Sequence, residues 1–226
     1  TVITDLSSPY MRAAGRLYNY ALTSHGRGET WPLWGTCMGM QVLSVLGAAD
    51  GRVLLSNAYD AESILLPLST TAAAKSSRLL CKGCLPAPAL DALVSKNVTV
   101  NLHHDGVAPD SFAAGLRLGG ASPLLSHNVD RTGQEFVSPI EATGGAPVWG
   151  AQWHPERPQF EWVVAGGPDF MTHGYDAVSS MWSVAAFFVE QCRRSSHRFA
   201  STRAEAKALI YNFRPEGDTS YQAYLF

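Results

Sequence analysis

The sequence lacks any apolar run of the roughly 20 residues that a membrane-spanning helix needs. It also lacks an excess of either charge, because 17 Lys and Arg residues stand against 19 Asp and Glu residues, for a formal net charge of -2. We therefore expect neither a membrane nor a nucleic acid as a partner. No internal repeat or low-complexity linker interrupts the 226 residues, so we expect a single domain over residues 1–226.

Cysteine is scarce: the chain has only Cys37, Cys81, Cys84 and Cys192. Four cysteines are too few for a disulfide-rich scaffold. Cys81 and Cys84 have the C-x-x-C spacing, but no second pair is present to complete a zinc site. We therefore expect a local disulfide or two free thiols there, and we expect neither a metal site nor a cofactor.

The most informative stretch is residues 31–43, where a short apolar strand, a Gly-Thr-Cys-Met-Gly turn and an apolar helix follow one another. A reactive residue between two glycines at a strand-to-helix turn is typical of a nucleophile elbow. The glycines allow the sharp bend, and the positive end of the following helix favours the thiolate form of Cys37. A buried structural cysteine in a tight turn fits the same pattern equally well. The turn alone leaves both interpretations open.

A second stretch supplies the partners that a cysteine nucleophile needs. Residues 147–154 are predicted to form a strand that ends on His154, and Glu156 follows two positions later. In an extended segment these two side chains point the same way, and Pro155 restricts the backbone between them. Imidazole can ionise a thiol and later protonate a leaving amine, while a carboxylate fixes the orientation of the ring. Together the two stretches favour a catalytic site over a structural cysteine.

The remaining pattern predicts an α/β protein. Periodicity indicates helices over residues 10–23, 38–46 and 176–194, and strands over residues 51–58, 62–68, 98–102, 124–127, 135–141 and 147–154, whereas residues 70–93 give no clear pattern. We expect a three-layer αβα fold with a mainly parallel central sheet and some antiparallel strands between residues 124 and 141. On the helix over residues 176–194 we interpret the stripe of Val178, Met181, Trp182, Ala185, Phe188, Val189 and Cys192 as core-facing. Cys192 would then be a buried structural thiol.

The two motifs, residues 35–39 and 150–156, resemble those of the class I glutamine amidotransferase-like superfamily, which has a flavodoxin-like α/β fold and a Cys–His–Glu triad. Within it the chain is similar to the gamma-glutamyl hydrolase family, known as peptidase C26. The segments that match are residues 32–39, 101–103, 135–138, 148–156, 160–162, 186–189 and 207–213. The resemblance implies that Cys37 is the nucleophile, His154 the general base and acid, and Glu156 the residue that orients His154.

The resemblance also implies a substrate. A member of this family would hydrolyse γ-glutamyl bonds in the poly-γ-glutamate tail of folates and antifolates, a small-molecule folylpoly-γ-glutamate substrate, through an acyl-enzyme. The backbone N–H of Met38 would donate to the oxyanion. His103 matches a family histidine near the nucleophile and would contact substrate, although a strand-end histidine bonded to backbone is the alternative. Gln41 stands where some relatives carry glutamate, so we also assign it to substrate contact.

Further expectations concern the setting of the protein. The family implies a lysosomal, vacuolar or extracellular location, and it implies that a homodimer can form. The Asn97-Val98-Thr99 sequon makes Asn97 a candidate glycosylation site. The superfamily places a Gly-Gly turn and early strands ahead of the nucleophile, and no counterpart precedes the helix over residues 10–23. We therefore expect a chain that is N-terminally incomplete.

Two other functions stay open at this point. The glutaminase domain of an amidotransferase shares the triad, but it usually works with a fused or partner synthase. A non-catalytic relative would keep the fold as a binding or structural protein, and the presence of Cys37, His154 and Glu156 argues against it.

Overall fold

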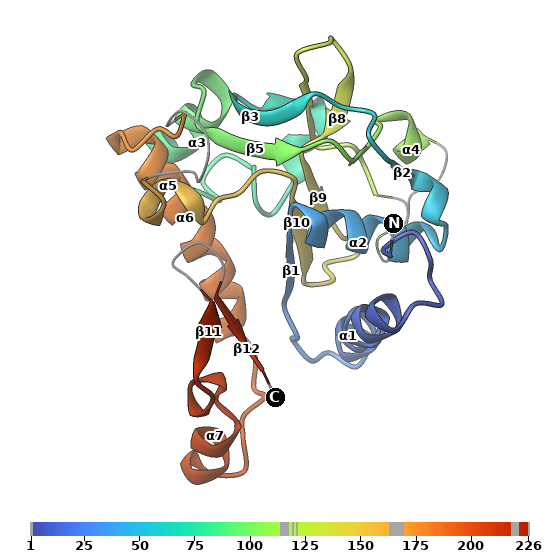
Figure 1. Ribbon diagram of the computed structural model, residues 1–226, viewed down its shortest axis with the longest axis vertical. Coiled ribbons are helices and arrows are strands. Elements are labelled where there is room, and N and C mark those ends of the chain that lie inside the picture. The colour runs from blue at the N-terminus through green and yellow to red at the C-terminus, as the bar shows by residue number, and fades with distance from the viewer. Residues whose placement is uncertain are drawn as a thin grey trace.

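The computed structural model describes residues 2–113, 118, 120, 122–162, 170–217 and 222–225 (Figure 1). Its helices are α1 (Pro9–Gly26), α2 (Met38–Ala48), α3 (Ala87–Ser95), α4 (Asp110–Ala113), α5 (Arg157–Phe160), α6 (Tyr175–Arg193) and α7 (Thr202–Ala208), with 3-10 turns at Gly51–Val53, Ala72–Ser76 and Ile210–Asn212. Its strands are β1 (Leu33–Thr36), β2 (Leu54–Leu55), β3 (Ala61–Leu66), β4 (Ser69–Thr70), β5 (Thr99–His103), β6 (Gly106–Val107), β7 (Ser126–Val129), β8 (Glu135–Val137), β9 (Pro139–Glu141), β10 (Val148–Ala151), β11 (Pro215–Gly217) and β12 (Gln222–Tyr224).

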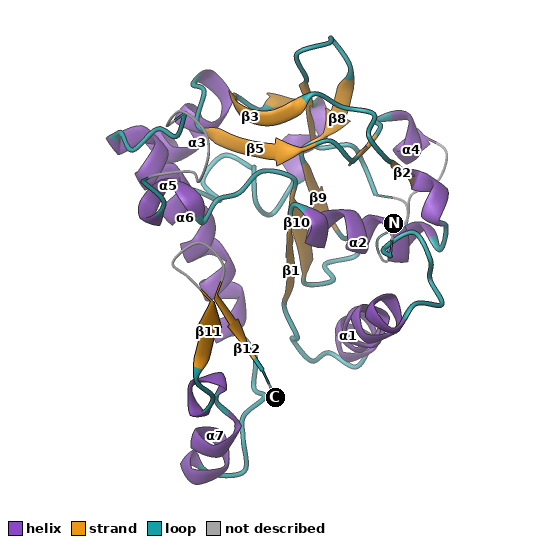
Figure 2. Cartoon of the chain, viewed as in Figure 1, coloured by secondary structure: helices purple, strands orange, loops and turns teal. Residues whose placement is uncertain are grey.

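The central sheet has the order β1-β10-β9, with helices on both faces (Figure 2). β1 and β10 run parallel, so that Thr36 lies opposite Ala151, while β10 and β9 are antiparallel. Every residue of β10 is buried. Val148 packs into the apolar cluster that includes residues of α1 and α2, whereas Trp149 packs into the cluster that includes residues of α3 and α6. Alternate side chains of one strand thus join the two halves of the core.

The other strands form smaller antiparallel sheets: β3 with β5, β4 with β7 and β8, β2 with β6, and β11 with β12. The α/β class is therefore confirmed. The structure does not confirm a mainly parallel central sheet, because β1 and β10 are the one parallel pair among the strands of the described residues. The expected antiparallel strands between residues 124 and 141 are present as β7, β8 and β9.

Most long elements lie where periodicity predicts them. Helix α1 begins after Ser8, whose hydroxyl accepts from the backbone N–H of Met11, and Pro9 occupies its first turn. The strand predicted over residues 51–58 is wrong: a 3-10 turn is followed by only the two residues of β2. Residues 70–93, which gave no pattern, contain a second 3-10 turn and the start of α3. In the part of the chain that the structure describes, no helix has the length and apolarity of a membrane span.

The expected core face of α6 is wrong. The buried residues of this helix are Ala177, Ser180, Met181, Val184 and Phe187, so that only Met181 belongs to the predicted stripe. Trp182 is 66 % exposed, and Cys192 is an exposed free thiol rather than a buried one. Two apolar stripes run side by side along α6, and the sheet and α3 bury the stripe that contains more small residues.

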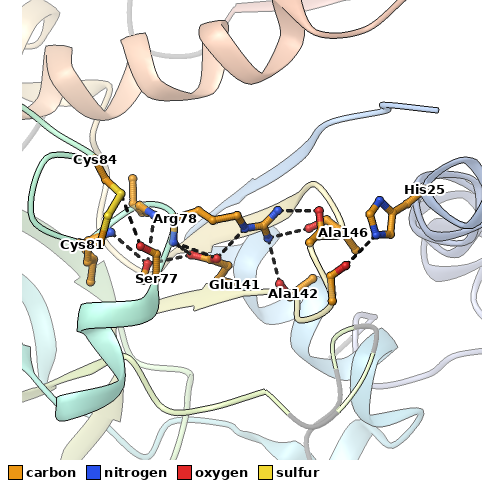
Figure 3. A network of polar contacts seen from close by, with 12 residues as sticks. His25, Ser77, Arg78, Cys81, Cys84, Glu141, Ala142 and Ala146 are labelled. Carbon is orange, nitrogen blue, oxygen red and sulfur yellow. Dashed lines mark hydrogen bonds and ion pairs between the residues drawn. A yellow bond between two sulfur atoms is a disulfide. The ribbon is translucent and has the colours of Figure 1, made fainter. Parts of the chain in front are cut away.

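A half-buried ion pair connects the segment after the second 3-10 turn to strand β9 (Figure 3). The guanidinium of Arg78 donates to Glu141 at 2.7 Å and to the carbonyl oxygens of Ala142, Gly145 and Ala146 at 2.7–2.9 Å. The hydroxyl of Ser77 donates to the other carboxylate oxygen of Glu141 at 2.8 Å. The guanidinium also lies 4.4 Å from the ring centroid of Trp149, which adds a cation–π contact.

The ion pair predicts a large cost for removing one partner. Arg78→Met keeps most of the aliphatic stem but leaves the Glu141 carboxylate buried without its counter-charge, so we expect a loss of about 3 kcal/mol in the free energy of unfolding. Urea denaturation measures this loss. Arg52→Met is the matched control, because Arg52 pairs with Asp50 at an exposed surface and its loss should change stability little. Equal effects of the two substitutions would contradict the prediction.

Candidate active site

Cys37 occupies a strained turn between β1 and α2. Its backbone has φ 50° and ψ -108°, a conformation that residues with a Cβ rarely adopt and that costs on the order of 1–3 kcal/mol. The backbone N–H of Cys37 donates to the Ala151 carbonyl of β10 at 2.7 Å, and its carbonyl accepts from the N–H of Gln41 at 3.1 Å. The central sheet and the helix therefore hold Cys37 from both sides.

Of the two glycines that flank this turn, only Gly35 is required for steric reasons. A Cβ at Gly35 would lie 2.4 Å from the carbonyl carbon of Gly39, whereas a Cβ at Gly39 would meet nothing within 4 Å. Strand and helix approach each other most closely at Gly35. A third glycine, Gly150 of β10, faces α2, and a Cβ there would lie 2.8 Å from Cγ of Met40.

The structure brings His154 and Glu156 together beside Cys37. Nδ1 of His154 lies 2.7 Å from Oε1 of Glu156, so that the interaction with the Cys37 side chain that raises the pKa of His154 falls to the other ring nitrogen, Nε2. The segment is a turn leading into α5, with Glu156 in the helical region of the backbone, and not the extended segment that we expected. The backbone N–H of His154 donates to Val100 of β5 at 2.8 Å. This hydrogen bond to β5 therefore fixes the backbone position from which the His154 imidazole extends.

His154 and Glu156 each stabilise the charged form of the other. Burial lowers the pKa of His154, but hydrogen bonds to Cys37 and Glu156 outweigh burial and raise the pKa to about 9. Burial likewise raises the pKa of Glu156, but the hydrogen bond from His154, the charge of His154 and smaller contributions from the backbone and Arg157 together outweigh burial, so that the net shift is downward. At neutral pH the pair is therefore an imidazolium and a carboxylate.

His103 differs from His154 because its pKa is lowered and not raised. It is 5 % exposed at the end of β5, and its Nδ1 lies 2.9 Å from the carbonyl oxygen of Asp105. Because a carbonyl only accepts, Nδ1 carries the proton, and the buried Nε2 atom has no partner among the described residues. Burial lowers the pKa of His103 to about 4, with a further contribution from the nearby charge of His154. The side chain is thus a neutral imidazole near the triad, and it makes the backbone bond that the sequence left as an alternative.

Gln41 is buried at 4 % exposure, and its amide is already engaged by the protein. Nε2 donates to the Asp105 carbonyl at 2.9 Å and to Oε1 of Gln152 at 3.3 Å. Gln152, which lies within the motif over residues 150–156, is completely buried, and its Nε2 lies 3.5 Å from Sγ of Cys37. The sequence signal that could have identified it was a glutamine between Ala151 and Trp153 in a predicted apolar strand.

The remaining predicted residues are placed as follows. Met38 is the first residue of α2, and the first N–H groups of a helix have no acceptor within it. Asn97 is exposed just before β5. Cys81 and Cys84 form a disulfide, one of the two states expected for them. Across the residues that the structure describes, no cluster of three or more His, Cys, Asp or Glu side chains could hold a metal ion.

Comparison with known proteins identifies the family of the chain. The family model Peptidase C26 matches residues 6–156, which include Cys37, His154 and Glu156. The chain belongs to the peptidase C26 family. The gamma-glutamyl hydrolase of Mus musculus is 36% identical over 228 residues, covering 99% of this chain and 68% of the relative. The gamma-glutamyl hydrolase of Homo sapiens is 34% identical, covering 97% and 67%. Gamma-glutamyl hydrolase 1 of Arabidopsis thaliana is 27% identical, covering 91% and 57%.

Membership of this family makes the chain a hydrolase of the peptidase type.

The close approach at Gly35 can be tested by a pair of substitutions. Gly35→Ala forces a Cβ into the backbone of Gly39, so we expect the free energy of unfolding to fall by about 2 kcal/mol or more. Gly39→Ala places the same methyl group in open space on a helix, where alanine is favoured over glycine, and should be neutral or stabilising by up to about 1 kcal/mol. Urea denaturation of both variants decides the matter. Comparable losses would show that the turn does not depend on contact at Gly35.

The buried neutral state of His103 predicts a pH dependence of stability. The pKa is about 6.5 in the unfolded chain and about 4 in the folded protein, so between these values only the unfolded state takes up the proton. Stability therefore falls as the pH drops from about 6.5 to about 4, by about 3 kcal/mol from this residue. In His103→Gln the fall over this range should be smaller by that amount. Unfolding measured at pH 7.5 separates the packing cost of the substitution, and an unchanged fall would contradict the prediction.

Proposed function

We propose that this chain hydrolyses γ-glutamyl amide bonds in the poly-γ-glutamate tail of folates and antifolates, with Cys37 as the nucleophile. One observation carries the proposal: His154 contacts Cys37 through one ring nitrogen and Glu156 through the other, in a chain of the peptidase C26 family. The printed names of the relatives supply the bond, since each of those compared above is a gamma-glutamyl hydrolase. The triad geometry supplies the chemistry.

In the first step the thiolate of Cys37 attacks the carbonyl carbon of the γ-glutamyl amide. The pKa of about 9 for His154 supports an imidazolium at neutral pH, which balances the thiolate before the attack. Negative charge then develops on the carbonyl oxygen. The backbone N–H of Met38, at the positive end of α2, is the donor that this chain offers to that oxygen.

In the second step Nε2 of His154 donates its proton to the leaving amine, and the amide bond breaks to give an acyl-enzyme. His154, now neutral, can take a proton from water, which attacks the thioester and releases the acid. Glu156 keeps Nδ1 protonated and the ring in place throughout, because the carboxylate accepts from Nδ1. Water is the final acceptor, so no cofactor enters the reaction.

The proposal extends to the domain organisation, the extent of the sheet, the oligomeric state, the location and glycosylation. We propose one domain over residues 1–226, and a three-layer fold in which the β1-β10-β9 sheet is part of a larger, mainly parallel sheet. The position of β1 at the edge of the β1-β10-β9 sheet of the described residues supports this, because an edge strand can pair with a further strand. A homodimer and a lysosomal, vacuolar or extracellular location rest on family resemblance, and exposure of Asn97 supports its glycosylation.

The proposed nucleophile is tested with a matched pair of cysteine variants. Cys37→Ala should lose all detectable hydrolysis of pteroyl-polyglutamate, a fall of at least about a thousandfold, because no other group can form the acyl-enzyme. Cys192→Ala, which removes the exposed thiol on α6, should keep wild-type activity. Chromatography of the shortened folate and of released glutamate measures both.

Three outcomes would contradict the proposal. Equal activity of the Cys37→Ala variant and the wild type would reject the nucleophile. Ammonia released from free glutamine, with pteroyl-polyglutamate left intact, would instead identify a glutaminase. An inert wild type whose fold is intact would identify a non-catalytic relative.

A further inference from the structure

A line of buried amides connects the loop after β5 to the sulfur of Cys37. It begins at the carbonyl oxygen of Asp105, passes through the side chains of Gln41 and Gln152, and ends 3.5 Å from Sγ. Gln152 is completely buried, and its backbone is fixed because its N–H donates to Ser138 at 2.7 Å. This line is separate from the contacts that His154 and Glu156 make with the same site.

The anchor determines which way each amide points. The Asp105 carbonyl can only accept, so the group of Gln41 that faces it is the NH₂ group. The second hydrogen of that NH₂ group is directed at Gln152, which must therefore present its oxygen. The NH₂ group of Gln152 is then left to face the sulfur. The Asp105 carbonyl therefore determines that Gln152 presents a hydrogen-bond donor to the sulfur of Cys37.

We propose that Gln152 is a further catalytic residue, whose amide N–H stabilises and positions the thiolate of Cys37, and that Gln41 is a positioning residue that fixes the orientation of that amide. The inference rests on the proposed function, since it concerns the same nucleophile. A hydrogen bond to a charged acceptor is stronger than one to a neutral acceptor, so this donor favours the thiolate over the thiol. It also holds the sulfur in a strained turn, where nothing caps α2 through a side chain.

This assignment changes the role of Gln41. Both of its amide hydrogens are used inside the protein, so it has no donor left for a substrate. Its effect on the reaction passes through Gln152. A buried pair of glutamines with a purely structural role would satisfy each other or the backbone, whereas here the free donor of the pair ends on the reacting atom.

The test is the alkylation of Cys37 by iodoacetamide in the whole chain, which needs no substrate. The rate at pH 6 divided by the rate at pH 9 reports how well the site holds the thiolate. In Gln152→Leu, which removes the donor but keeps the bulk, we expect this ratio to fall about tenfold. Gln152→Glu should lower it at least as much, because a carboxylate in the same place repels a thiolate. Cys192, read by mass spectrometry in the same sample, is the internal reference for the reagent.

Gln41→Leu provides the second variant. Without its anchor the Gln152 amide can turn, so the ratio should fall by a smaller factor of about three. This variant also keeps the inference falsifiable if the Gln152 variants fail to fold. An unchanged ratio in folded Gln152→Leu or Gln41→Leu protein, whatever its stability, would overturn the inference and leave a structural role. The proposed function fails separately, through hydrolysis by the Cys37→Ala variant, so the two failures can be told apart.

Discussion

The parallel pairing of β1 with β10 is the contact on which the site depends. Parallel strands end at the same edge of a sheet, and the register that sets Thr36 opposite Ala151 brings Cys37 and the segment of Gln152 and His154 to that edge together. The bond from the Cys37 N–H to the Ala151 carbonyl extends the ladder one step into the turn. A slip of one residue would move Cys37, the proposed nucleophile, away from His154, the proposed base. The buried core on both sides of β10 makes such a slip costly.

The electrostatic environment of the site gives two nearby histidines opposite charge states at neutral pH. His154 gains a carboxylate and a thiol as neighbours, and its pKa rises to about 9 in spite of burial. His103 makes a hydrogen bond to a carbonyl and packs against Phe136, at 4.7 Å between ring centroids, and burial, with a contribution from the nearby charge of His154, lowers its pKa to about 4. A charged His103 would repel the imidazolium that the thiolate needs. Its apolar surroundings therefore protect the charge balance of the triad.

The grouping of three site residues could be predicted from sequence, because two short motifs contain them. The glycine before Cys37 and the His-Pro-Glu segment led to three side chains that the structure does bring together. The core face of α6 could not be predicted, since the helix carries apolar residues on two neighbouring stripes. Only the tertiary contacts determine which stripe is buried. The hydrogen-bond partners of Gln41 could not be predicted for a related reason. Whether a polar side chain on a helix faces substrate or protein depends on a partner, here the Asp105 carbonyl, that lies 64 positions away.

The antiparallel β3–β5 sheet supports the site through His103 and through the loop that follows β5. β5 accepts the backbone N–H of His154 through Val100, ends on His103, and leads into Asp105. The carbonyl of Asp105 receives both His103 and Gln41, and its carboxylate accepts the N–H of Asn57 at 2.8 Å. One short loop therefore fixes the protonated nitrogen of one histidine and the orientation of the amide chain that ends on sulfur. The parallel pair places the reacting atoms, and the antiparallel sheet sets the polarity of the groups around them.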